Sequence, residues 1–158
     1  MLRGVKAFII VMFFVIFVSG GSNPLRADDS NLDAATQARI AKADQGPRTI
    51  DVSGYPQKLQ DIYTDIFSQK CTQCHRLSRP INSDFALPSE WESYVKKMMH
   101  KPGSNINFGQ ARKIIDFLIY DSSVRKKALL EEKLSKLTPE QRAAQEAKIK
   151  KVQDKYGQ

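Results

Sequence analysis

The chain has 158 residues, of which 41% are hydrophobic and 27% are charged. This suits one small globular domain with extensions, and two cysteines are too few for a disulfide-rich scaffold or a four-thiolate zinc site. The formal net charge is +8, but residues 28–120 carry 12 basic and 11 acidic side chains. The central part of the chain is therefore nearly neutral, and the basic surplus lies at the two ends.

Residues 1–27 have the pattern of a secretory signal peptide. Arg3 and Lys6 precede an apolar run over residues 7–18. At about 1.5 Å per residue this run is much shorter than a ~30 Å hydrocarbon core, so we expect cleavage after Ala27. An uncleaved membrane tether is the alternative. Either way, we expect a periplasmic or otherwise exported protein.

Residues 28–54 are predicted to be a polar linker. Their first half is Ala-rich and contains few large apolar residues, which favours at most a marginal helix. Glycine and proline residues follow, among them Gly46, Pro47 and Gly54, and they indicate an irregular connection.

Residues 55–120 are predicted to be an all-α domain of three main helices. Apolar residues recur at i, i+3, i+4, i+7 and i+8 in the segments 59–67, 91–99 and 111–119, the spacing of a core-facing helix. Helix starts are expected at two capping boxes, Ser89 with Glu92 and Asn107 with Gln110.

Residues 121–158 are predicted to be a charged helical extension. Thr138 and Gln141 make a third capping box, which starts a second helix there. The extension is interpreted either as a solvated tail or as a hairpin that binds a partner protein. Nucleic-acid binding is not expected, because the chain is predicted to be exported and the extension has one aromatic residue, Tyr156.

The residues with the clearest chemistry are Cys71-Thr72-Gln73-Cys74-His75, directly after the first predicted helix. This spacing is typical of covalent haem attachment, because two thiols on one turn add to the two vinyl groups of one haem and the adjacent imidazole reaches the iron. A haem would also enlarge the core of a domain of about 66 residues. A redox dithiol and a zinc site are the alternatives, but no βαβ pattern accompanies the motif, and few further ligands for zinc exist.

A second iron ligand is sought by elimination. Beyond residue 27 the only thioethers are Met98 and Met99, and the only spare imidazole is His100. On a helix Met98 lies within about 20° of Trp91, whereas Met99 and His100 are about 80° and 180° away. Met98 is thus the first candidate, Met99 the second and His100 the third, with an ordinary core role for Met98 as the alternative.

Residues 55–120 resemble the class I cytochrome c family, particularly its small single-haem members. The matching features are Phe67 one turn before Cys71, the run that ends at Pro80, and Trp91, Val95 and Met98 in a Trp-x-x-x-Val-x-x-Met pattern. The resemblance implies a cytochrome c-like domain of three main helices around one covalently bound haem c. The segments 28–54 and 121–158 are not part of that family's minimal domain.

The resemblance also implies roles for individual residues. Cys71 and Cys74 correspond to the covalent haem links, His75 to the proximal iron ligand and Met98 to the distal one. A carbonyl near Pro80 would accept the other imidazole proton of the histidine. Candidate contacts to the haem propionates are Arg79 and Trp91.

We therefore expect an exported single-haem electron carrier rather than an enzyme. Methionine and histidine ligation raises the reduction potential of such a haem. Lys96, Lys97 and Lys101 are candidates to steer an acidic redox partner. The alternatives are a haem sensor or peroxidase-like protein with a weak or open distal site, and a haem subunit of a larger redox complex assembled through residues 121–158.

Overall fold

The computed structural model describes residues 31–157, and every regular element in this range is helical, which confirms the all-α prediction. The predicted signal peptide lies outside the described residues. Within them, no helix is both long enough and apolar enough to cross a membrane. The elements are α1 (Ala34–Asp44), α2 (Gln57–Ile62), η1 (Tyr63–Phe67), α3 (Ser68–Cys71), α4 (Ser78–Ile81), α5 (Pro88–Met99), α6 (Phe108–Val124), α7 (Lys127–Leu134) and α8 (Pro139–Tyr156).

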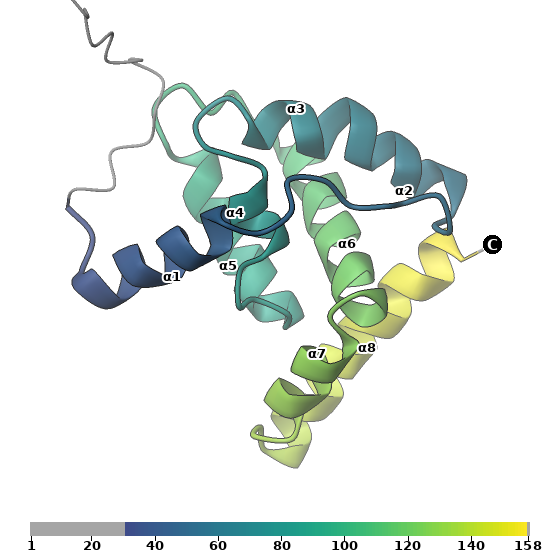
Figure 1. Ribbon diagram of the computed structural model, residues 1–158. Helices are drawn as coiled ribbons and strands as arrows, with labels where there is room; N and C mark the ends of the chain where they lie inside the picture. The colour runs from purple at the N-terminus through teal and green to yellow at the C-terminus, as the bar shows by residue number, and fades with distance from the viewer. Residues whose placement is uncertain (1–30, 158) are drawn as a thin grey trace, which may run out of the picture.

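The first predicted helix is present as one continuous rod formed by α2, η1 and α3 (Figure 1). Its middle part, η1, is π-helical, and the N–H of Ser68 donates to the carbonyl of Tyr63 five residues earlier. Leu59 and Phe67 are fully buried, and the ring of Phe67 lies 5.0 Å from that of Phe117 on α6. The apolar stripe predicted from the sequence thus faces α6, and the rod ends at the Cys-x-x-Cys-His motif.

The second and third predicted helices are α5 and α6, which pack against each other. The capping box of Asn107 and Gln110 is confirmed at the start of α6. The one predicted for Ser89 and Glu92 is wrong, because α5 starts earlier, at Pro88, and Glu90 accepts from the backbone N–H of Leu87 at 2.9 Å. Proline is favoured at the first helical position, which moves the start of the helix upstream.

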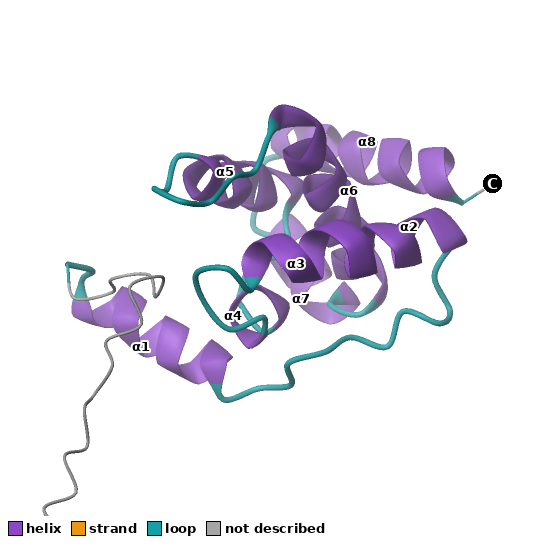
Figure 2. Ribbon diagram, turned by 90° about the horizontal axis from the view of Figure 1, so that it is seen from above, coloured by secondary structure: helices purple, strands orange, loops and turns teal. Residues whose placement is uncertain are grey.

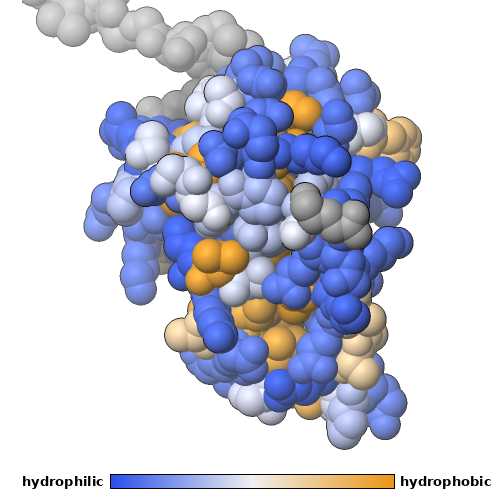
Figure 3. Space-filling model, turned by 90° about the vertical axis from the view of Figure 1, so that its right-hand side faces the viewer, coloured by the Kyte–Doolittle hydropathy of each residue, from blue (hydrophilic) through white to orange (hydrophobic). Residues whose placement is uncertain are grey.

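The C-terminal helices return to the body of the molecule and are not a solvated tail. α6 continues past Tyr120 to Val124, and α8 then runs along α6, so that the chain ends near α2 (Figure 1). Thr138 caps α8 as predicted. Hydrophilic side chains cover most of the side of the molecule shown in Figure 3, with small apolar areas between them. Residues of α7 and α8 that join the hydrophobic core are Leu130, Leu134, Ile149, Val152 and Tyr156.

The segment predicted as a polar linker is attached to the domain through α1 and the chain that follows it (Figure 2). α1 packs on α4, and Asp44 at its end forms an ion pair of 2.9 Å with Arg79. The side-chain amide of Asn82 donates to the carbonyls of Ala43 and Pro47 at 3.2 and 2.8 Å. These contacts hold the residues that directly follow the Cys-x-x-Cys-His motif.

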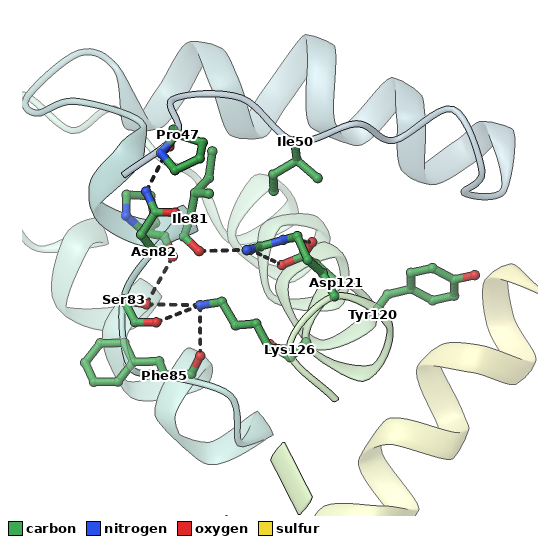
Figure 4. A network of polar contacts seen from close by, with 12 residues as sticks. Pro47, Ile50, Ile81, Asn82, Ser83, Phe85, Tyr120, Asp121 and Lys126 are labelled. Carbon is green, nitrogen blue, oxygen red and sulfur yellow. Dashed lines mark hydrogen bonds and ion pairs between the residues drawn. The ribbon is translucent and has the colours of Figure 1, made fainter. Parts of the chain in front are cut away.

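A buried lysine joins the loop before α5 to the end of α6 (Figure 4). Lys126 is 9% exposed, and its ammonium group donates to the carbonyls of Ser83 and Phe85 at 2.9 and 3.1 Å. The same group lies 4.9 Å from the ring centroid of Trp91. Burial lowers the pKa of Lys126 to about 8, with the nearby Arg125 charge as a smaller cause.

The substitution Lys126→Met tests this burial. Because the folded pKa of Lys126 is about 8 and its ordinary value is 10.5, the unfolded chain binds more protons between these values, and the contribution of Lys126 to stability rises with pH. From about pH 7 to about pH 9, urea unfolding should show the wild type gaining about 1.4 kcal/mol over Lys126→Met. The exposed neighbour Lys127, changed to Met, should keep the wild-type pH dependence. Parallel curves for wild type and Lys126→Met would contradict the buried charge.

Candidate functional site

The Cys-x-x-Cys-His motif lies where α3 ends and the chain turns toward α4. The hydroxyl of Thr72 donates to the carbonyl of Ser68 at 2.7 Å, which closes the last turn of the helix. Cys71 and Cys74 are half-buried, whereas Thr72 and Gln73 between them are exposed. The turn therefore directs both thiols toward the protein and the intervening side chains toward solvent.

Cys71 is held in an apolar environment. Its side chain packs against the hydrophobic core, and both cysteines are free thiols. Burial raises the pKa of the Cys71 thiol to about 12, with the charge of Cys74 as a smaller cause. Cys71 is therefore a neutral thiol at physiological pH, and it reacts slowly as a thiolate nucleophile.

His75 lies between a backbone carbonyl and α5. Its Nδ1 is 3.0 Å from the carbonyl oxygen of Arg76, and its Nε2 is 3.4 Å from the hydroxyl of Tyr94. A carbonyl at Nδ1 suits the tautomer with the proton on that nitrogen, which leaves Nε2 as the ligating atom. The acceptor in this structure is the carbonyl of Arg76, whereas the resemblance implies a carbonyl near Pro80; the carbonyl of Pro80 itself accepts from the hydroxyl of Ser83 at 3.0 Å.

The three candidates for the distal iron ligand lie at the end of α5 in different surroundings. Met98 is half-buried and follows Tyr94 by four residues, so it shares the face of α5 that meets His75. Met99 packs against the edge of the core and lines an open depression of about 470 Å³. His100 is exposed, and its Nδ1 lies 2.7 Å from the carbonyl of Lys96. Helix geometry therefore favours Met98 over Met99 and His100 as the second candidate iron ligand beside His75.

The two candidate propionate contacts have protein partners in this structure. The indole N–H of Trp91 donates to the hydroxyl of Ser122 at 2.8 Å, and both side chains are fully buried. Arg79 forms the ion pair with Asp44 described above. A propionate would have to replace these partners, so a propionate role for either residue stays a prediction.

Two features of the site were missed by reasoning from the sequence. Tyr94 lies on the apolar stripe predicted over residues 91–99, but its contact with His75 depends on how α5 is placed against the motif. The second is a link of 2.9 Å from the ammonium of Lys70 to the carbonyl of Asn105, which joins the helix that carries the motif to the loop after α5. Neither partner lies close in sequence, so no local pattern could have revealed them.

The hydrogen bond between Trp91 and Ser122 can be tested by Ser122→Ala. This change leaves the buried indole N–H without its acceptor and should cost about 1–3 kcal/mol of unfolding free energy in urea titrations. Ser123→Ala is the matched control, because that half-buried hydroxyl bonds to the carbonyl of Tyr120 in its own helix and accepts only a long, exposed contact of 3.4 Å from Gln153, and it should cost about 0.5 kcal/mol. Equal costs for the two variants would show that the Trp91 N–H has another acceptor.

The comparisons with known proteins give no information about this site. No model of a protein family matches the chain, and neither curated proteins nor solved structures give a match. Within residues 31–157, no group of three His, Cys, Asp or Glu side chains is placed to hold a metal ion. The donor groups of the site are two thiols and an imidazole on the motif, with thioethers on the facing helix, and this set can hold one haem.

Proposed function

We propose that the chain is an exported electron-transfer protein with one covalently bound haem c. The observation that carries the proposal is the orientation of His75 in the Cys-x-x-Cys-His motif. Its Nδ1 faces a backbone carbonyl at 3.0 Å, and its Nε2 faces α5. This is the arrangement that fixes a ligating imidazole, because the hydrogen bond at one nitrogen sets the tautomer and the direction of the other.

Cys71 and Cys74 are the residues that would attach the haem. Each sulfur forms a C–S bond to one vinyl group and its thiol proton goes to the neighbouring vinyl carbon, so the addition needs no oxidant and releases no leaving group. The neutral, buried thiol of Cys71 retains the proton that this addition uses. The two residues between them, Thr72 and Gln73, form a turn that keeps both sulfurs on one side of the helix end, as one ring requires.

Met98 is the proposed distal ligand. Its thioether would need no proton release to bind, and the hydroxyl of Tyr94, 3.4 Å from Nε2 of His75, would have to leave that nitrogen free for iron. The haem supplies one-electron chemistry by cycling between ferric and ferrous iron. Trp91 and Val95 on the same helix are buried in the core. With His75 and Met98 both serving as iron ligands, the site would suit electron transfer better than substrate turnover.

The surface around the end of α5 suits an acidic redox partner. Lys96, Lys97 and Lys101 are exposed there, and Phe108, which is 81% exposed at the start of α6, offers an apolar contact. Exposed lysines steer encounter with an acidic surface without tight binding. A transient partner of this kind is part of the proposal.

Attachment is tested by producing the full chain in a host that exports it and attaches haem c. Intact mass should show one haem on the polypeptide, retained after acid denaturation because the links are covalent. Cys71→Ser and Cys74→Ser should each leave a single link, visible as an altered reduced spectrum of the denatured pyridine complex. A wild-type mass without haem would overturn the proposal.

The distal ligand is tested by the visible spectrum of the oxidised protein. The charge-transfer band from methionine sulfur to ferric iron should be present in wild type and absent in Met98→Ala. Met99→Ala is the matched control, because it removes the neighbouring thioether on a different face of α5, and it should retain the band. Loss of the band in Met99→Ala alone would transfer the role to Met99.

Two other spectra would favour the alternative functions. A high-spin wild-type protein that binds carbon monoxide without denaturant would favour a haem sensor or a peroxidase-like protein. A low-spin spectrum without the methionine band would assign His100 as the ligand. Co-purification with other redox subunits, lost when residues 121–158 are removed, would favour a subunit of a larger complex.

A further inference from the structure

Three side-chain contacts from α7 and α8 reach α5. The ammonium of Lys133 lies 2.5 Å from a carboxylate oxygen of Glu90, and that of Lys148 lies 2.7 Å from Glu92. The side-chain oxygen of Gln145 accepts from the backbone N–H of Ser89 at 3.0 Å. All three contacts reach the first half of α5, whose last turn carries the candidate iron ligands.

Glu90 connects these contacts to the start of the helix. One of its carboxylate oxygens accepts from the backbone N–H groups of Ala86 and Leu87, each at 2.9 Å, and the other pairs with Lys133. The side chains of Lys133 and Glu90 are 21% and 25% exposed, so solvent screens this pair less than a surface pair. The position of the first turn of α5 is therefore coupled to α7.

Glu92 and Ser89 make the corresponding connection to α8. Lys148 and Gln145 lie three residues apart on α8, so they project from one face of that helix toward α5. α8 in turn is fixed to α6, where Lys155 and Tyr156 both bind the carboxylate of Asp116, at 2.6 and 2.9 Å. α8 thus spans from α6 to α5 and is attached at both.

We infer that α7 and α8 position α5 for iron ligation, with Lys133, Gln145 and Lys148 as positioning residues. This inference rests on the proposed function, since it concerns the ligand on α5. Contacts to the first half of α5 help to fix the rotation of the helix about its axis and its position along that axis. Because α5 is a single helix of twelve residues, its last turn is fixed in the same way. The face with Tyr94 and Met98 is thereby kept toward His75, and loosening α7 and α8 weakens the bond between Met98 and iron.

The test uses the haem-loaded full-length protein with the double substitution Lys133→Met and Lys148→Met. The matched control is Lys136→Met with Lys150→Met, which also removes two lysines, but these pair within their own part of the chain, with Glu132 and Asp154. Added imidazole competes with the distal methionine for ferric iron. Its affinity should rise about three- to tenfold in the test variant and stay at the wild-type value in the control.

Two further measurements separate positioning from general stability. The reduction potential should fall in the test variant, because weaker methionine ligation favours ferric iron, and Lys133→Arg with Lys148→Arg should restore both potential and imidazole affinity. Hydrogen exchange of the α5 amides should be faster in the test variant than in the control, with unchanged exchange in α2. Equal imidazole affinity, potential and exchange in test and control variants would overturn the inference.

The outcomes also distinguish this inference from the proposed function. A wild-type protein that lacks the methionine band contradicts the proposed ligand, whatever α7 and α8 do. Hydrogen exchange of the α5 amides then tests by itself whether α7 and α8 position α5, because this measurement does not depend on iron. Faster exchange in the test variant supports a role for α7 and α8 in holding α5, and unchanged exchange removes it.

Discussion

The geometry of the site depends on the burial of Trp91. Its indole is fully buried, its N–H donates to Ser122 on α6, and the ammonium of Lys126 lies 4.9 Å from its ring. A large ring with a directional hydrogen bond permits few rotations of the helix that carries it. These contacts of Trp91 therefore restrict the rotation of α5 together with the contacts from α7 and α8, and Tyr94, on the next turn, faces His75.

The site lies between two parts of the chain that are held from different directions. On the motif side, Asp44 and the loop after α1 bind Arg79 and Asn82, which follow His75. On the α5 side, α7 and α8 supply the contacts. Both supports come from segments outside residues 55–120, which carry the motif and α5. The extensions therefore supply part of the rigidity that a small helical domain gains with difficulty from its own core.

A charged group, the ammonium of Lys126, is buried beside the core. Burial of Lys126 carries a desolvation penalty, which is offset by the carbonyls of Ser83 and Phe85 and by the face of Trp91. These acceptors belong to the loop that leads into α5. The buried ammonium of Lys126 in Figure 4 thus holds the loop before α5 in place, and this loop has no regular backbone hydrogen bonding of its own.

The sequence by itself determined the features that depend on residues within about four positions of one another. These are the three amphipathic helices, the capping boxes at Asn107 and Thr138, and the order of thiols and imidazole in the motif. The capping box predicted at Ser89 is wrong, because α5 starts at Pro88 and Glu90, not Glu92, bonds back to the N-cap.

Only the tertiary structure decided which faces meet. Apolar spacing shows that one side of a helix is buried, but not against which element, so the return of α7 and α8 onto α5 and α6 could not be derived from it. The approach of Tyr94 to His75 has the same origin. Hydrogen bonds and ion pairs act over a few ångströms, and only the folded chain brings residues of distant sequence position within that range.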